Sequence, residues 1–322
     1  MLCGMNPSQT PSLDRGDRRS LDRDDHRSLD RSDHRRGLQL LLGIALYVVA
    51  QLVMVGVAGL VGGPAGTLTG ALIGAAVAVG GYLLIVGPIG GRPGLGLRGR
   101  GKLAELALGL AIGTALLLLA VGLISLFGGY RVTGISTSPQ LLVPLAIGIG
   151  AGFVEEVDFR GVLLRVLDAW LGSWAALAIT SLLFGLIHLM NPGASIWTAL
   201  GLVIEAGVLL GAAYLLTRRL WLAFGLHIAW NTLQAGVFSS AVSGSGTQSG
   251  LLIAEFSGPT WLDGASMGIE GSLVTVLLGF ATGIVMLVLA ARRGHLRGPV
   301  RRQHQESAIR GDERVLTRRV SE

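Results

Sequence analysis

Four ionisable side chains stand within a stretch of the sequence that is otherwise apolar. The segment "GFVEEVDFRG" contains Glu155, Glu156, Asp158 and Arg160, inside a run long enough to cross a bilayer. At the centre of a membrane helix such groups cost about 2.5–3.5 kcal/mol each, so the set costs on the order of 10 kcal/mol before any pairing. Ionisable residues kept at that depth indicate a functional site.

The spacing within this segment pairs one acid with the arginine and leaves another acid alone. Glu156 and Arg160 lie four positions apart on one helical face, with the acid first, which is the favourable order for an ion pair. Glu155 points about 100° away around the helix and has no partner nearby in the sequence. Such a carboxyl is expected to stay neutral or to face a water-filled cavity, which makes Glu155 a candidate general base. Asp158 is predicted to lie on a helix face or cavity edge without a chemical role.

Two later apolar runs carry polar residues at helical spacing. "FGLIH" places Phe184 and His188 on one face, and "HIAWN" does the same for His227 and Asn231. With Glu155, these side chains are suitable for activating a water molecule and stabilising an oxyanion.

Each of these residues also has a structural alternative. A single His or Asn in a membrane helix often links helices through hydrogen bonds worth about 1 kcal/mol. Glu156 and Arg160 can be a structural clamp that carries no proton. Glu205, in the middle of "GLVIEAGVLLG", is either functional or caps a partner helix.

At these residues the sequence resembles the CPBP family of intramembrane proteases, which includes the CAAX prenyl endopeptidases and bacteriocin-associated proteins. The family's Glu-Glu pair followed by Phe-Arg-Gly matches 155–161, although Asp158 stands where many members have an apolar residue. Its Phe-x-x-x-His motif matches 184–188, and its third motif, His-x-x-x-Asn or Asp, matches 227–231. The resemblance predicts a protease core over 139–238.

The resemblance implies hydrolysis of a peptide bond in or beside the membrane, in a membrane-associated peptide or protein substrate. By analogy, Glu155 and His188 polarise the attacking water, and His227 with Asn231 holds the oxyanion. Glu156 and Arg160 would then be supporting residues that orient the first motif.

A metal is a separate hypothesis. Glu155, His188 and His227 could bind zinc and leave a fourth position open. The H-E-x-x-H helix of many zinc proteases is absent, however, and the two histidines belong to different helices. A mechanism without a cofactor is therefore favoured.

The composition predicts an all-α, polytopic membrane helix bundle. Of 322 residues, 51% are hydrophobic and 14% charged, and the mean hydropathy is +0.62. The 50 glycines suit close helix packing in lipid. Runs that could span a bilayer number about eight: 38–61, 67–89, 103–127, 141–167, 174–190, 196–217, 219–238 and 271–292.

The distribution of basic residues predicts the orientation. They concentrate after the second and sixth runs and in the C-terminal tail, whereas 239–270 has no Lys or Arg and 128–140 has only Arg131. The positive-inside rule then makes both termini cytoplasmic, in a multi-pass protein of the plasma membrane. Because the net charge of +6 is explained by topology, a nucleic-acid partner is not expected. Cys3 is the single cysteine, which excludes disulfides and thiolate metal sites.

The segments outside the predicted protease core are assigned from their composition and their apolar runs. Residues 1–37 contain three near-identical charged octads and are predicted to be a disordered tail. The other predicted parts are N-terminal membrane helices over 38–130, an extracytoplasmic Gly/Ser-rich loop at 239–270, a last membrane helix at 271–292 and a basic cytoplasmic tail at 293–322.

Two other functions remain open at this point. The first is a non-catalytic membrane scaffold or bacteriocin-immunity protein of the same fold. The second is a proton-coupled transporter that uses Glu155, Glu205 and the histidines as a relay, although the internal repeat typical of transporters is absent.

Overall fold

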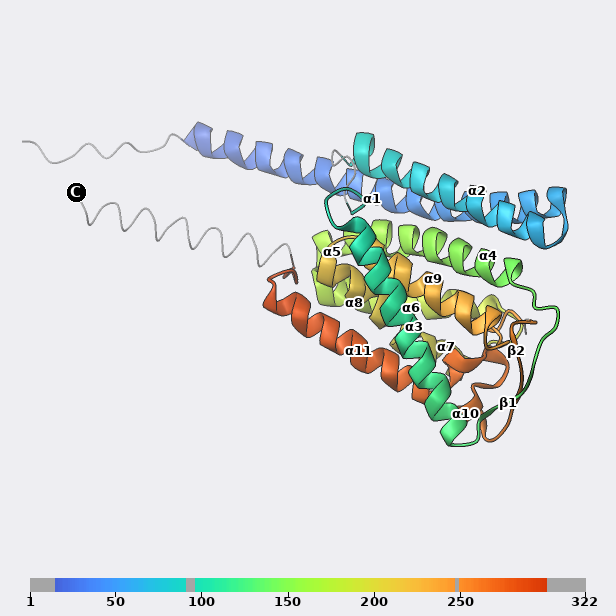
Figure 1. Cartoon of the computed structure of the whole chain (residues 1–322). Coiled ribbons are helices and arrows are strands. Elements are labelled where there is room, and N and C mark those ends of the chain that lie inside the picture. Colours follow the sequence, from blue (N-terminus) through green and yellow to red (C-terminus); the bar gives the residue numbers. More distant parts are fainter. Residues whose placement is uncertain (1–14, 91–95, 247–248, 300–322) are drawn as a thin grey trace, which may run out of the picture. The chain divides into compact units, whose positions relative to one another are not determined.

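The structure is a computed structural model that describes residues 15–90, 96–246 and 249–299, and it is mostly helical (Figure 1). The α-helices, in chain order, are α1 (Arg15–Val61), α2 (Gly63–Leu84), α3 (Lys102–Leu126), α4 (Leu142–Gly150), α5 (Arg165–Leu171), α6 (Ser173–Ile187), α7 (Ile196–Leu202), α8 (Val208–Thr217), α9 (Trp221–Gly236), α10 (Thr260–Asp263) and α11 (Leu273–Arg292). The π-helical segments are η1 (Ile85–Ile89), η2 (Ala151–Glu155), η3 (Val157–Leu164) and η5 (Val203–Gly207). The 3₁₀ segments are η4 (His188–Met190), η6 (Ala265–Met267) and η7 (Ile269–Gly271).

Six helical segments among the described residues are long and apolar enough to cross a membrane, so this is a multi-pass helical membrane protein. They are His34–Val61, Gly63–Ile89, Lys102–Leu126, Ser173–Met190, Ile196–Thr217 and Leu273–Arg292. The other two predicted runs are also helical. The run 141–167 contains the charged motif, and 219–238 gives α9, which has 16 residues.

Glycines bring α3 and α9 together at backbone distance. Gly109 of α3 faces Gly225 of α9, Gly113 faces Leu226 one residue further along α9, and a Cβ built on Gly225 would lie 2.2 Å from the Leu106 carbonyl oxygen. Small residues at this spacing allow close packing in lipid, where the hydrophobic effect does not drive association. Because α9 also carries His227, this contact fixes the position of the third motif.

π-Helical turns interrupt the helices at charged residues. Glu155 ends η2, Arg160 lies within η3, and Glu205 is the middle residue of η5. A π-helical turn contains one extra residue, so it changes the direction of the side chains that follow, and such turns are frequent at functional sites.

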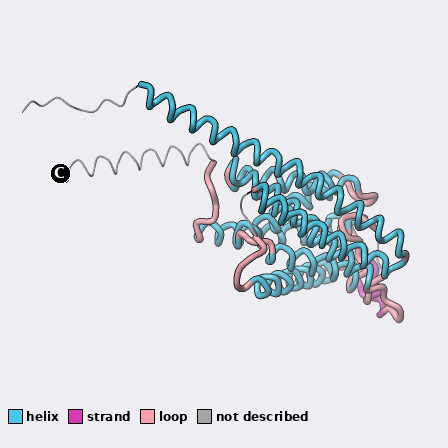
Figure 2. The backbone as a smooth tube through the Cα atoms, turned by 90° about the horizontal axis from the view of Figure 1, so that it is seen from above, coloured by secondary structure: helices cyan, strands magenta, loops and turns pink. Residues whose placement is uncertain are grey.

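A two-stranded sheet departs from the all-α prediction. Strand β1 (Tyr130–Ile135) pairs antiparallel with β2 (Leu252–Phe256), with Tyr130 opposite Phe256. Both strands lie at one end of the helix bundle (Figure 2). The segment 239–270, predicted as a Gly/Ser-rich loop, thus contains a strand, the short helix α10 and two 3₁₀ turns. Pairing between segments more than 100 positions apart gives no local signal in the sequence.

The chain divides into two units, Met1–Leu38 and Gln39–Glu322. Within the first unit the residues from Arg15 onward are helical, because α1 starts there, whereas a disordered tail was expected for 1–37. The octads place acids and bases at helical spacing, which favours a helix. A membrane helix follows them directly, so the helix can extend from it without a separate nucleation step. Residues 1–14 lie outside the described part of the chain.

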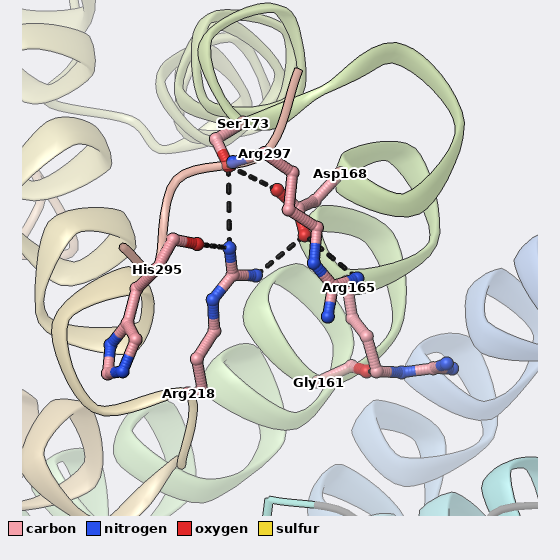
Figure 3. A network of polar contacts seen from close by, with 7 residues as sticks. All are labelled: Gly161, Arg165, Asp168, Ser173, Arg218, His295 and Arg297. Atoms are coloured by element: carbon pink, nitrogen blue, oxygen red, sulfur yellow. Dashed lines mark hydrogen bonds and ion pairs between the residues drawn. The ribbon is translucent and has the colours of Figure 1, made fainter. Parts of the chain in front are cut away.

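A buried carboxylate links α5 to the start of α6, to the end of α8 and to the segment after α11 (Figure 3). This network lies at the end of the bundle away from the sheet (Figure 1). Asp168, 1% exposed, accepts a hydrogen bond from Arg218 Nη1 at 2.6 Å and from the Ser173 hydroxyl. The Arg297 backbone N–H donates to Ser173 Oγ at 2.8 Å, and Arg297 Nη1 lies 3.5 Å from Asp168 Oδ2. The start of the predicted basic tail at 293–322 is therefore bound to the α5–α6 turn, and 300–322 lies outside the described residues.

Candidate active site

One carboxylate oxygen connects the first and third motifs. Glu156 is fully buried, and its Oε1 accepts a hydrogen bond from Arg160 Nη1 at 2.7 Å and another from His227 Nδ1 at 2.8 Å. The Glu156–Arg160 ion pair predicted from the spacing is present. The contact with His227 was not predicted.

Arg160 also connects the first motif to the second. Its guanidinium carbon lies 4.5 Å from the centre of the Phe184 ring, and its Nη2 donates to the Ala206 carbonyl oxygen at 3.2 Å. A guanidinium that is 2% exposed needs such partners, because an unpaired buried charge is strongly destabilising. The Phe of the second motif therefore supports the Arg of the first.

Both histidines have their Nδ1 atoms occupied. His188 Nδ1–H donates to the Phe184 carbonyl oxygen at 2.6 Å, and His227 Nδ1–H donates to Glu156. Since carbonyl and carboxylate oxygens only accept, Nδ1 carries the hydrogen in each ring. The Nε2 atoms of both rings are thus left for chemistry.

Glu155 is half-buried at the end of η2. Its Oε2 atom is shielded from solvent and has no hydrogen-bond partner among the described residues. The carboxyl is close enough to His227 and Arg160 to interact with them electrostatically. The solitary acid expected from the sequence therefore lies beside the Glu156 cluster.

A small cavity adjoins the third motif. Its volume of about 20 Å³ is sufficient for an ordered water molecule. Its walls are formed by Phe184, Leu202, Glu205, Ala206, Leu209, Leu210, Leu226, His227, Trp230, Asn231, Ser243 and Glu270. Two of the four predicted catalytic residues, His227 and Asn231, thus share this cavity, while Glu155 and His188 are outside its lining.

Residues from the segment 239–270 contribute to the site, which sequence reasoning missed. Glu270, 3% exposed, lines the cavity and accepts a hydrogen bond from the backbone N–H of Ser243. It also interacts electrostatically with His188 and His227. A carboxyl directly before the last apolar run, in "GIEGS", was the only available signal.

Asp158 is buried away from this cavity. It is 5% exposed, and its Oδ1 lies 3.2 Å from a Cβ built on Gly43 of α1. That oxygen has no hydrogen-bond partner among the described residues. Asp158 therefore faces α1, which agrees with the predicted position on a helix face and not with the alternative at a cavity edge.

The described residues contain no group of three or more His, Cys, Asp or Glu side chains arranged to hold a metal ion. Glu155, His188 and His227, the set considered for zinc, do not form such a group in this arrangement.

Comparison with known proteins agrees with the three motifs. Residues 137–233 match the family model described as type II CAAX prenyl endopeptidase Rce1-like, and this range contains every motif residue. No curated protein and no solved structure matches the chain. The part of the chain from 137 to 233 is therefore similar to the Rce1-like CAAX prenyl endopeptidases.

Proposed function

We propose that this protein is an intramembrane endopeptidase that hydrolyses a peptide bond in or beside the membrane. The observation that carries the proposal is the shared Oε1 of Glu156, which holds Arg160 and His227 in one buried cluster. Burying such a cluster in a membrane protein costs free energy. Its presence therefore indicates a role, such as the orientation of reacting groups. The resemblance of 137–233 to a protease family supports the same reaction class.

Two groups are suited to activate the water. Glu155 has a buried carboxyl oxygen without a partner, which can accept a proton from water, and His188 presents Nε2 because its Nδ1–H is bound to Phe184. The hydroxide formed in this way attacks the carbonyl carbon of the substrate. The proton on Glu155 then passes to the leaving amine as the C–N bond breaks, which completes the hydrolysis.

His227 and Asn231 stabilise the negative charge that develops on the carbonyl oxygen. His227 can donate from Nε2 only when both ring nitrogens carry hydrogen, since Nδ1–H is bound to Glu156. The carboxylate of Glu156 favours this doubly protonated ring. Asn231 adds a neutral donor one helical turn further along α9, and preorganised donors of this kind account for a large part of many rate enhancements.

The topology proposed for this function has eight membrane crossings with both termini in the cytoplasm. Contacts at two opposite ends support it. At one end, Arg219 Nη1 donates to the Arg100 carbonyl oxygen at 2.9 Å, and Arg297 binds the α5–α6 turn. At the other end, β1 pairs with β2. The arginine-rich end then faces the cytoplasm of a plasma-membrane protein.

The substrate class is a membrane-associated peptide or protein. The description of the matching family names prenylated CAAX sequences. The chemistry proposed here requires only a peptide bond that reaches His227 and Asn231 from the membrane.

The experiment compares membrane peptides in cells that produce wild-type protein or the Glu155→Gln variant at equal abundance. Gln keeps the size and hydrogen bonding of the side chain and removes the base. Glu255→Gln is the matched control, because Glu255 lies in β2, 59% exposed, in a surface pair with Arg131. A defined set of peptides should accumulate uncleaved only in Glu155→Gln. If the three peptide profiles coincide while deletion of the protein still has a phenotype, a binding function replaces the protease.

A further inference from the structure

Two carboxyl side chains from outside the three motifs face the cavity beside His227 and Asn231. Glu205 belongs to η5 and is 1% exposed, and Glu270 belongs to η7 and is 3% exposed. Both line the cavity, and they are close enough to interact electrostatically. The proposed hydrolysis uses neither of them.

The packing holds Glu205 toward this cavity. A Cβ built on Gly279 of α11 would lie 2.5 Å from Glu205 Cγ, so α11 leaves no room behind the side chain. Glu205 Oε2 is buried and has no hydrogen-bond partner in the described part of the chain. A carboxyl oxygen in this position lacks a donor, and a ligand that enters the cavity can supply one.

Glu270 forms the second wall of the same site. One of its oxygens is occupied by the backbone N–H of Ser243, which fixes the carboxyl in place. His188 and His227 are the other titratable groups that interact with it. No lysine or arginine is among the residues that line the cavity.

The cavity suits an ammonium group. Its volume of about 20 Å³ holds one group of the size of water, and an ammonium has that size, three donors and a positive charge. That volume admits the ammonium head alone, so the alkyl chain of a ligand stays outside the cavity, while Leu202, Leu209 and Leu210 form the apolar part of its walls. We propose that Glu205 and Glu270 form a subsite for the alkylammonium group of a substrate, such as a lysine side chain, next to the groups that hydrolyse the peptide bond.

The role in substrate selection rests on the proposed function, whereas ammonium binding can be measured without hydrolysis. The full-length protein in lipid nanodiscs is heated with n-butylammonium chloride, with n-butanol as the neutral match. The Tm should rise saturably with n-butylammonium in wild type and in Glu255→Gln, and the rise should be lost in Glu205→Gln and reduced in Glu270→Gln. Equal shifts in wild type and Glu205→Gln, or no shift beyond that of n-butanol, would overturn the proposal.

A cleavage assay measures the specificity. Apolar peptides carry lysine, acetyl-lysine or norleucine at each position in turn, with a free or acetylated N-terminus to separate a side chain from a terminal amine. Wild type should prefer lysine at one position by about tenfold in kcat/KM, and Glu205→Gln should bring the ratio of lysine to norleucine close to one. If wild type cleaves no peptide faster than Glu155→Gln, the proposed function fails, and the n-butylammonium result alone decides the subsite. A lysine preference that persists in Glu205→Gln would refute the assignment.

Discussion

The Oε1 atom of Glu156 lies 2.8 Å from Nδ1 of His227, although the two residues are 71 positions apart. The same oxygen binds Arg160, so a single buried atom fixes the geometry of two motifs. Glu156 is therefore a positioning residue in the proposed reaction, while Glu155 is left to exchange protons.

The ion pair between Glu156 and Arg160 should be strongly coupled. Glu156→Gln leaves a buried guanidinium without its anion, and Arg160→Met leaves a buried carboxylate. Each change should lower the free energy of unfolding by about 3–5 kcal/mol. The double variant removes both charges and should lower it by clearly less than the sum. Unfolding titrations of the four proteins in mixed micelles measure this coupling, and additive losses would contradict the buried pair.

Asn231 should affect catalysis more than binding. Because it donates to charge that develops only in the transition state, Asn231→Ala should lower kcat by about 10²–10³-fold and leave KM nearly unchanged. The measurement is steady-state cleavage of a peptide identified from the Glu155→Gln cells. A change in KM alone would show that Asn231 binds substrate and does not stabilise the oxyanion.

The contact between α3 and α9 should not tolerate a methyl group. In Gly225→Ala the new carbon would lie 2.2 Å from the Leu106 carbonyl oxygen, so the helices must separate. This should lower the free energy of unfolding by about 1–3 kcal/mol, and activity should fall because α9 carries His227. Gly122→Ala on α3 is the matched control, since nothing lies within 4 Å of its added carbon. That change should be neutral or stabilising by up to about 1 kcal/mol. Thermal unfolding of both variants checks the difference, and equal Tm values would disprove the close contact.

Glu270 should make stability depend on pH in the acidic range. Burial raises the pKa of its carboxyl above the ordinary 4.5, and the hydrogen bond from Ser243 offsets part of this effect. At a pH below 4.5 both the folded and the unfolded states are protonated at this position. As the pH rises, the unfolded state loses its proton first, so stability falls until the pH passes the raised pKa of the folded state.

Glu270→Gln should remove this component of the pH dependence. The Tm of wild type and variant is measured from about pH 4 to pH 8, and the difference between the two curves isolates Glu270 from other groups. The Tm of wild type minus the Tm of Glu270→Gln should decrease as the pH rises, and it can change sign. Parallel curves would indicate that Glu270 titrates at its ordinary pKa.

Composition and local motifs were enough to predict the class of protein and the local chemistry. Apolar runs of bilayer length predicted a polytopic helical protein, and three short motifs predicted the similarity that 137–233 has to CAAX proteases. The Glu156–Arg160 pair was also predictable, because residues four positions apart on a helix are neighbours.

The way in which these elements meet depends on tertiary contacts. Three features join segments that are distant in the chain. They are the hydrogen bond between Glu156 and His227, the pairing of β1 with β2, and the position of Glu270 in the lining of the cavity. Their positions depend on helix packing at glycines and on π-helical turns that redirect side chains. Local spacing does not predict these contacts. It fixes the face of a helix on which a residue lies, but not which helix packs against that face.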